Sequence, residues 1–216
     1  MNAYPETPRW RRAVIEQTID AAVDDVFPLA CPVMEYLWIP GWKCELVHCP
    51  NGRVELGCVF REIYSAPVLM RRVTGKTVWT TVLHEPERHR VHYRLENEIA
   101  DCLCKIECEA LADQKTQVCL DFTYTPLHEK GVWNMKKGGE DRLKLMLSLL
   151  AHMLKYYCER GEMVGAADVI SFVGRARELS VVDRLRFLLN GLAMAVMKDD
   201  DRKRFQKGLP IVKIRP

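Results

Sequence analysis

The sequence predicts an α+β domain in which a curved antiparallel sheet holds one long helix. Two changes of pattern indicate this fold. From Lys43 to His128, apolar and polar residues alternate in runs separated by turn residues, which is typical of antiparallel strands. From Gly131 to Gly161, the apolar residues instead recur at helical spacing. Because a strand and a pair of short helices precede these runs, the order of elements fits a sheet with its helices segregated to one face.

The first strand is predicted at residues 13–19, AVIEQTI, where the side chains alternate in character. Asp20 and the alanines after it lead into VDDVFPLACPVMEYLW. We interpret this segment as two short helical pieces separated by Pro32. The sequence WIPGW then ends the helical pattern, and the strand-rich part of the chain begins.

Turn sequences such as PNG and HEPERH divide the strand-rich part into five or six strands. We expect these strands at residues 43–48, 54–64, 76–85, 89–97, 99–111 and 115–126. The long helix that follows has one apolar stripe, and Gly161 is a suitable residue for its C-terminal cap. The stripe comprises Leu143, Met146, Leu147, Leu150, Met153, Leu154 and Tyr157.

The composition is that of an ordinary globular protein, because 48% of the 216 residues are hydrophobic and 28% are charged. This length favours one main domain at residues 1–162 and a helical extension at residues 163–216. A formal net charge of +3 is too small to indicate a nucleic-acid partner without a clustered basic face. The N-terminal MNAYPETPRW lacks the apolar core of a signal peptide, and no segment is apolar for long enough to span a membrane. We therefore expect a cytoplasmic protein.

The segment DCLCKIECEAL, residues 101–111, places three cysteines among carboxylates. On a strand, Cys102, Cys104 and Cys108 share one face with Ile106, whereas Lys105 points to the other face, so the cysteines look inward. Neighbouring side chains on one face lie about 6.6 to 6.8 Å apart, at the upper limit for a disulfide, and a zinc site needs ligands that converge. We interpret the nine cysteines of the chain as thiols and this group as a lining, in preference to a metal site or a reactive thiol.

Three features of the sequence resemble the START-like SRPBCC superfamily, which includes polyketide cyclases and ligand-binding proteins. They are the order of elements, the WIPGW segment, and TVWTTVLHEPERHRVHYRLEN as a strand, a proline turn and a strand. The resemblance covers residues 13 to about 160. It implies a helix-grip fold with a deep cavity between the sheet and the long helix, where many members hold a hydrophobic molecule.

Side chains on the inward parities of the predicted strands are candidates for contact with such a molecule. The tryptophans of WIPGW are placed either to gate the mouth of a cavity or to close one end of the core. An interior rich in cysteine, aliphatic and tyrosine side chains suits a mostly apolar ligand with a few polar anchors. The candidate ligand-binding residues are Trp38, Trp42, Cys58, Phe60, Trp79, Tyr93, Cys104, Ile106, Leu120, Phe122, Tyr124 and Leu150.

Polar residues on the same inward parities are the candidates for acid–base chemistry, because burial shifts the pKa of a carboxyl or a phenol. Glu62 and Tyr64 are the candidate catalytic residues, and Tyr93 and Tyr124 share this inward orientation. A carboxylate among apolar neighbours, such as Glu62, needs a partner or a function. For His84 and His92, a solvent-exposed role is favoured over catalysis.

Other charged residues and motifs add little to these candidates. Arg61 and Arg94 fall on outward parities. The basic segment VLMRRVTGK, residues 68–76, suits an acidic ligand or a membrane surface, but a solvated loop is favoured. The sequence has no nucleophile elbow, glycine-rich phosphate loop or HExxH motif. We therefore predict neither a covalent mechanism nor a cofactor.

The extension contains a second amphipathic segment. Ser180 with Asp183 resembles a capping box at the start of VVDRLRFLLNGLAMAVM. An apolar stripe of this strength must be covered, and packing on its own domain or on a second copy in a homodimer is favoured over a membrane surface or a partner protein. The stripe comprises Val181, Leu185, Leu188, Leu189, Leu192 and Val196.

Two hypotheses of function follow. In the first, the domain binds a small hydrophobic molecule, lipid-like, aromatic or isoprenoid, in a cavity between the sheet and the long helix. In the second, it is an enzyme of the polyketide cyclase or dehydratase kind, in which Glu62 and the tyrosines move protons. The binder is favoured because the spacing of residues fixes no second catalytic group beside Glu62. An interaction protein that uses the C-terminal helix is compatible with either.

Overall fold

A computed structural model describes residues 10–39, 42, 44–51, 54–62, 77–111, 114–135, 139–174 and 185 of the chain. These residues form one antiparallel sheet of seven strands in the order β1-β7-β6-β5-β4-β3-β2. The strands are β1 (Arg11–Ile19), β2 (Cys44–His48), β3 (Val59–Glu62), β4 (Val78–Glu85), β5 (Arg90–Glu96), β6 (Ala100–Leu111) and β7 (Lys115–Pro126).

The helices occur at three points in the chain. The short helix α1 (Val23–Val26) and the 3-10 helices η1 (Phe27–Ala30) and η2 (Glu35–Leu37) lie between β1 and β2, and η3 (Pro86–Arg88) forms the β4–β5 turn. After β7 come α2 (Glu129–Met135), α3 (Gly139–Arg160) and α4 (Ala166–Gly174). The predicted α+β fold, with an antiparallel sheet around a long helix, is confirmed.

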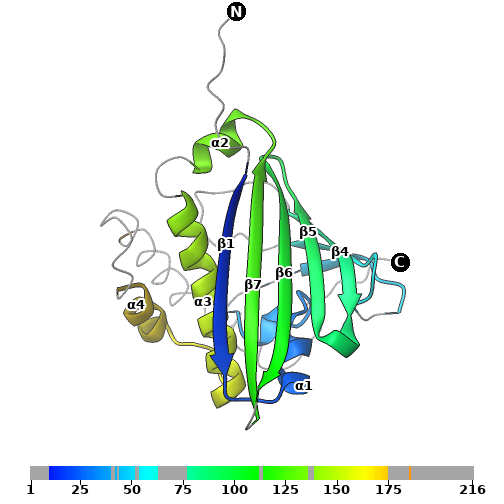
Figure 1. The fold of residues 1–216 in the computed structure, drawn as a ribbon. Helices are drawn as coiled ribbons and strands as arrows, with labels where there is room; N and C mark the ends of the chain where they lie inside the picture. The colour runs from blue at the N-terminus through cyan, green and yellow to red at the C-terminus, as the bar shows by residue number, and fades with distance from the viewer. Residues whose placement is uncertain are drawn as a thin grey trace, which may run out of the picture.

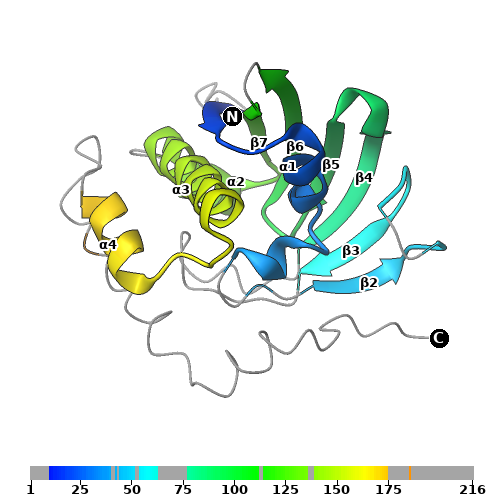
Figure 2. The ribbon, with the colours of Figure 1, turned by 90° about the horizontal axis from the view of Figure 1, so that it is seen from below.

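The sheet is strongly curved, and α3 lies on its concave side. Figure 2 shows the strands curving round from β1 and β7 to β3 and β2, with α3 beside the β1 end. Helix α3 packs most closely along β1 and also touches β7 (Figure 1). Because α3 lies at the β1 end of the sheet, the concave faces of β4 and β5 face the interior at a distance from this helix.

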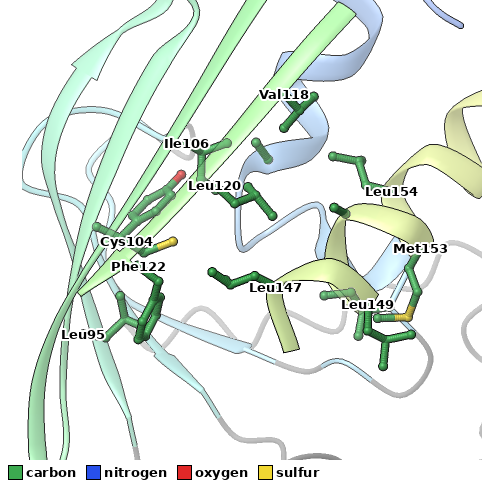
Figure 3. Packing of buried hydrophobic residues seen from close by; sticks show 14 of the residues in the cluster. Leu95, Cys104, Ile106, Val118, Leu120, Phe122, Leu147, Leu149, Met153 and Leu154 are labelled. Carbon is green, nitrogen blue, oxygen red and sulfur yellow. The ribbon is translucent and has the colours of Figure 1, made fainter. Parts of the chain in front are cut away.

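The side chains of the strands alternate between this interior and the outer face, as the period-two pattern predicts. On β6, the side chains of Cys102, Cys104, Ile106 and Cys108 are all buried. In Figure 3, inward side chains of the sheet point toward α3, from which Leu147 extends to meet them. The predicted inward face of the cysteine strand is therefore confirmed.

Helix α3 is buried on more than one side. Leu143, Leu147 and Leu154 of the predicted stripe are fully buried, but Met146 and Leu150 are only half-buried. Leu145 and Leu149, which lie off that stripe, are buried as well. Part of the extra covering comes from α4, where Phe172 stacks on His152 with 4.6 Å between the ring centroids. The sequence pattern of α3 alone does not reveal this second contact.

Two predicted elements differ in extent from those observed. The predicted helical region at residues 131–161 contains two described helices, α2 and α3, and residues 136–138 between them lie outside the described part of the chain. The third predicted strand begins at Val59 and not at residue 54, because Gly57 adopts a left-handed backbone with φ +84° just before it.

Some predictions concern residues outside the described part of the chain. Tyr64 and the basic segment at residues 68–76 lie outside it. So does the C-terminal amphipathic stripe except for Leu185, which is exposed. The boundary between a main domain at 1–162 and an extension at 163–216 stays a prediction. No helix within the described residues is long and apolar enough to cross a membrane.

Candidate functional site

One row of side chains crosses the concave face of the sheet from strand to strand. The backbone of Cys58 accepts a hydrogen bond from Thr81, Thr81 is opposite Tyr93, and Tyr93 is opposite Cys104. Cys104 is in turn opposite Phe122 on β7. The residues of this row are buried. Regular antiparallel pairing thus brings a threonine and a tyrosine hydroxyl into an otherwise apolar and sulfur-rich surface.

The neighbouring row holds the aromatic part of the site. Phe60 on β3 is opposite Trp79 on β4. The Trp79 ring makes edge-to-face contacts with Trp42, at 5.9 Å between centroids, and with Tyr93, at 5.7 Å. Tyr93 also contacts the edge of Phe60, at 6.4 Å. Four aromatic rings therefore pack in contact at the β3–β4 side of the interior.

Glu62 is the last described residue of β3 and lies at the border of this aromatic group. The indole N–H of Trp79 donates a hydrogen bond to Glu62 Oε2 at 3.3 Å. Burial raises the pKa of the Glu62 carboxyl to about 7, against the opposing effect of hydrogen bonds from Trp79 and Thr77. The carboxyl of Glu62 is therefore close to half-ionised at neutral pH.

A second buried carboxyl, Glu35, belongs to η2. The side chain is only 7% exposed. Burial, and then the nearby charge of Glu62, raise the pKa of Glu35 to about 8. Among the described residues, no side chain donates a hydrogen bond to the Glu35 carboxyl, and no lysine, arginine or histidine forms an ion pair with either glutamate. The two carboxyls thus have no cationic partner within the described chain.

The segment that carries Glu35 is held in place by the tryptophans of WIPGW. The indole N–H of Trp38 donates to the Leu29 carbonyl at 2.9 Å, and that of Trp42 donates to the Pro32 carbonyl at 2.6 Å. Backbone hydrogen bonds from Glu35 to Cys31 and from Ile39 to Glu35 tighten the turn between them. These contacts fix η2 over the interior with its glutamate inside.

Two hydroxyl groups of the interior have no hydrogen-bond partner within the described structure. They are Tyr93 Oη and Thr81 Oγ1, and both atoms are buried. Burial raises the pKa of the Tyr93 phenol well above its usual value, and the charges of Cys31 and Glu35 raise it further. The phenol therefore stays protonated near neutral pH and is available as a hydrogen-bond donor or acceptor.

The thiols around the two carboxyls are poor nucleophiles. Burial raises the pKa of Cys31 and of Cys44 to about 12, and Glu35 adds to both shifts. For Cys104, burial followed by the charge of Glu35 raises the pKa still further. Since the thiolate is the reactive form, these cysteines serve as apolar lining and not as reactive groups.

The predicted ligand-binding residues fall into three groups. Phe60, Tyr93, Cys104, Ile106, Leu120 and Phe122 are buried on the inner face of the sheet, and Trp42 and the half-buried Trp79 join them at the aromatic group. Trp38 and Cys58 are buried at the margins, and Leu150 is half-buried on α3. Tyr124 is inward, but its hydroxyl already donates to the Gly131 carbonyl at 3.3 Å.

Sequence reasoning missed Glu35 and Thr81. A signal for Glu35 was present, because it is the one charged residue in CPVMEYLWIPGW, residues 31–42. A carboxylate in so apolar a run either points to solvent or is buried for a reason. Thr81 carried no such signal, because threonine is common on both faces of strands.

The outward candidates are paired on the other face. Arg61 forms an ion pair with Glu45 at 3.0 Å, and Arg94 forms one with Asp101 at 2.8 Å. His92 lies 3.3 Å from Glu107 on the outer surface. His84 is different, because it is opposite the buried Val91 on the inner face near the end of β4; it stacks on Phe27, and burial lowers the pKa of its imidazole. None of these four residues lies beside Glu35 or Glu62 in the described contacts.

No metal centre is evident in the described residues, where no three histidine, cysteine or acidic side chains come together. None of the nine cysteines forms a disulfide, and all nine are in described segments. One pair is nevertheless close, since Cys58 Sγ lies 3.1 Å from Cys49 Sγ beside the β2–β3 hairpin.

A protein-family model described as polyketide cyclase / dehydrase and lipid transport matches residues 11–159, which span β1 to the end of α3. The chain belongs to this family. The predicted membership of the START-like SRPBCC superfamily is confirmed, and the domain is of the ligand-binding or polyketide cyclase type. Among curated protein sequences, none matches the chain.

Several solved structures share the fold. A START superfamily protein from Mycobacterium smegmatis aligns with a TM-score of 0.51 at 13% identity, covering 69% of this chain and 97% of its own. Ara h 8.0201 aligns at 0.50 and 13% identity, covering 69% and 98%. Norcoclaurine synthase from Thalictrum flavum, in complex with a transition-state analogue, aligns at 0.50 and 12% identity, covering 70% and 96%. At these identities the likeness shows the helix-grip fold alone.

Proposed function

We propose that the protein binds a small, mainly apolar molecule between the concave face of the sheet and α3. Glu35, Glu62 and Tyr93 are its polar anchors. The observation that carries this proposal is the buried Tyr93 hydroxyl, which has no partner among the described residues. The charge of Glu35 contributes to its raised pKa. A ligand with a polar end supplies the partner that the chain does not.

The free energy of these buried polar groups supports this proposal. A buried hydroxyl without a partner costs about 1–3 kcal/mol, and an uncompensated buried charge costs more. Tyr93, Thr81 and Glu35 carry such costs together on one side of the interior. Polar groups gathered in this way are typical of a binding site whose ligand offsets their cost.

The rest of the interior is suited to an apolar body. Leu95, Cys104, Ile106, Leu120 and Phe122 point inward from the sheet (Figure 3). None of them carries a charge or a strong hydrogen-bonding group, so an apolar molecule gains about 25 cal/mol for each Å² that it removes from water. A lipid-like, aromatic or isoprenoid molecule fits this chemistry.

A second candidate function is acid–base catalysis of the polyketide cyclase or dehydratase kind. The observation that favours it is the pKa of about 7 for Glu62, because a carboxyl that titrates near neutral pH both donates and accepts protons. In this case Glu62 transfers the proton, and Glu35 and Tyr93 orient the substrate. Tyr64 stays the second predicted catalytic residue.

Two measurements test the binding proposal. Native mass spectrometry of freshly purified protein is expected to show a co-purified small molecule. Titration with N-phenyl-1-naphthylamine, a neutral apolar fluorophore, is expected to give saturable binding that Ile106→Trp abolishes by filling the interior. Leu111→Trp, at the exposed end of β6, is the matched control and is expected to bind like the wild type. Equal affinity in a folded Ile106→Trp variant would overturn the proposal.

Glu62→Gln separates the two functions, because it keeps the shape of the side chain and removes its titration. In the binder, affinity for the neutral fluorophore stays nearly intact, because Glu62 serves only the polar end of a ligand and the apolar body makes most of the contacts. In the enzyme, turnover of a polyketide-like substrate falls by about 100-fold or more, the usual contribution of a general acid or base. Retained turnover in this variant would exclude Glu62 as the proton-transfer group.

A further inference from the structure

We infer that the polar end of the interior binds a protonated amine, held between the carboxyls of Glu35 and Glu62 and the faces of the neighbouring aromatic rings. This inference rests on the proposed function and names the chemical class of its ligand. It is carried by three observations: the buried carboxyl of Glu35 and the partly buried carboxyl of Glu62, neither paired with a described cation; an aromatic group around Glu62; and a buried phenol without a partner among the described residues.

The two carboxyls act on a common set of neighbours from four elements. The charge of Glu62 raises the pKa of Glu35, and both carboxyls raise the pKa of Cys44 on β2. Glu35 also acts on Cys31, on Tyr93 of β5 and on Cys104 of β6. Every one of these effects disfavours negative charge on the neighbour. When these carboxyls are ionised, the potential in this part of the interior is therefore negative, and a bound cation favours their ionised forms.

The described arginines that adjoin Glu62 and Tyr93 in the sequence form ion pairs with other carboxylates. Arg61 pairs with Glu45, and Arg94 pairs with Asp101, both on the outer face. No described lysine, arginine or histidine acts on Glu35 or Glu62. The counter-charge is accordingly left for the ligand to supply.

The aromatic rings suit an organic ammonium group better than a metal ion. A cation over the face of an indole or phenol ring gains about 0.5–2 kcal/mol, and tryptophan is the strongest partner. Trp42 meets Trp79 nearly at right angles, with an interplanar angle of 81°, so the two rings present different surfaces to the same region. A metal ion would need further ligands, and no third metal-ligating group joins the two glutamates in the described chain.

Other polar end groups fit less well. A carboxylate or phosphate would be repelled by both glutamates. A ligand that ends in a neutral carbonyl accepts a hydrogen bond from only one of the two carboxyls. The other carboxyl is then left without a partner. An ammonium group donates up to three hydrogen bonds. Glu35, Glu62 and the Tyr93 oxygen are three acceptors in this part of the interior, and they match that number.

Binding of an amine by this site is coupled to proton release. With the pKa of Glu35 at about 8 and that of Glu62 at about 7, the ligand-free pair holds on the order of one to two protons at pH 7. An ammonium ligand favours the ionised carboxyls, so it displaces these protons. Amine affinity therefore rises as pH increases from 6.5 to 8.5, until the amine itself begins to lose its proton.

Calorimetric titration of the full chain with two matched pairs of compounds tests this inference. The pairs are 4-phenylbutylamine with 4-phenylbutan-1-ol, and octylamine with octan-1-ol. In at least one pair, the amine is expected to bind about 10-fold or more tightly than the alcohol at pH 8.5, with a smaller difference at pH 6.5. Glu35→Gln and Glu62→Gln are expected to narrow this difference. Glu107→Gln, on the exposed outer face of β6, is expected to leave it unchanged.

The outcomes distinguish this inference from the proposed function. If the fluorophore binds but no amine exceeds its alcohol, the amine site is overturned and the apolar binding site remains. The same conclusion holds if an amine preference persists undiminished in both glutamine variants. If the fluorophore and all four compounds fail to bind, the proposed function is overturned together with the inference.

Discussion

Glu35 and Glu62 differ in what surrounds their carboxyl groups, and this difference sets the order in which they ionise. Glu62 accepts a hydrogen bond from the Trp79 indole, which favours its ionised form. Glu35 has no such donor among the described residues and also feels the charge of Glu62. Glu62 therefore loses its proton first as pH rises, and Glu35 follows. The hydrogen bond from the Trp79 indole N–H thus contributes to the difference in pKa between the two glutamates.

Glu35→Gln is expected to stabilise the ligand-free protein at pH 8. The pKa of Glu35 is raised from 4.5 to about 8 on folding. Below about pH 4.5 both states are protonated; as pH rises toward 8, the unfolded chain ionises while the folded chain holds its proton. The folded state then loses about 1.4 kcal/mol per pH unit from this group. Urea denaturation at pH 5 and pH 8 measures the effect.

The control for this prediction is Glu109→Gln, which changes an exposed carboxyl on the outward parity of β6. The increase in the free energy of unfolding caused by Glu35→Gln should be several-fold larger at pH 8 than at pH 5. The control variant should show no such dependence on pH. A Glu35→Gln variant that is equally or less stable than the wild type at pH 8 would show that the carboxyl already has a compensating partner.

Cys104 is expected to react slowly with a bulky charged thiol reagent. Its side chain is buried in the row that crosses the sheet, and burial raises the pKa of its thiol. Cys119 on β7 is half-exposed and should react first. Mass spectrometry of peptides after timed labelling gives both rates. Labelling of Cys104 as fast as Cys119 in the native protein would contradict its inward position.

At the scale of elements, the start of α2 is packed against the sheet by a glycine. A Cβ atom placed on Gly131 would lie 2.2 Å from the backbone oxygen of Ile99. The Gly131 carbonyl also accepts the hydrogen bond of the Tyr124 hydroxyl. The close approach between α2 and the chain before β6 therefore depends on the absence of a side chain.

Gly131→Ala is expected to destabilise the fold by about 1–3 kcal/mol, because the clash is with backbone that cannot rotate away. Thermal unfolding measures the loss. Gly165→Ala is the control, since its added Cβ would meet only the end of the Asp168 side chain at 3.3 Å. An unchanged melting temperature for Gly131→Ala would show that α2 shifts at no cost.

Beside the hairpin formed by β2 and β3, the thiols of Cys49 and Cys58 are in close contact. With 3.1 Å between the sulfur atoms, the two thiols are placed to form a disulfide by exchange with glutathione disulfide, which releases two molecules of glutathione. We expect this link to form before any other in the chain. Intact mass and peptide mapping after exposure to glutathione disulfide test it, with Cys49→Ser as control. Preferential linkage of a different pair would contradict the prediction.

The strands were predictable because each has a simple period, and the site was predictable only in part. Alternation placed Glu62 and Tyr93 on the inward face from sequence alone, and the structure agrees for Tyr93 and for the partly buried Glu62. Glu35 has no periodic context, because η2 is a single turn whose position depends on side-chain hydrogen bonds from Trp38 and Trp42 to the carbonyls of Leu29 and Pro32. Contacts of that kind follow from tertiary packing and not from local pattern.

At the scale of the whole molecule, the curved sheet brings two segments of different origin to one site. The β1–β2 connection contributes Glu35, and the β3–β4 side of the sheet contributes Glu62 and Trp79. The order of elements was sufficient to predict the helix-grip fold. It was not sufficient to show that the charge of Glu62 acts on Glu35, because that depends on how far the sheet bends around the interior (Figure 2).

A bound ligand is expected to stabilise the whole fold, because its contacts span the sheet, η2 and the side of α3. By mass action, N-phenyl-1-naphthylamine at 100 times its Kd raises the free energy of unfolding by about 2.7 kcal/mol. Thermal denaturation at increasing fluorophore concentration measures this effect. Ile106→Trp should show no concentration dependence. A melting temperature of the wild-type protein that does not change with fluorophore concentration would argue for binding at the surface.

Strand β1 pairs along its length with β7, from Arg11 opposite Tyr124 to Ile19 opposite Thr116. During translation the first strand therefore leaves the ribosome well before its partner exists. At roughly 5–20 residues per second, the wait is on the order of 5–20 s. The strand meanwhile offers unpaired backbone groups to other nascent chains. Its charged residues Arg11, Arg12 and Glu16 oppose such pairing. Arg12 and Glu16, which later lie on the outer face of the sheet, therefore also protect the chain while it is being made.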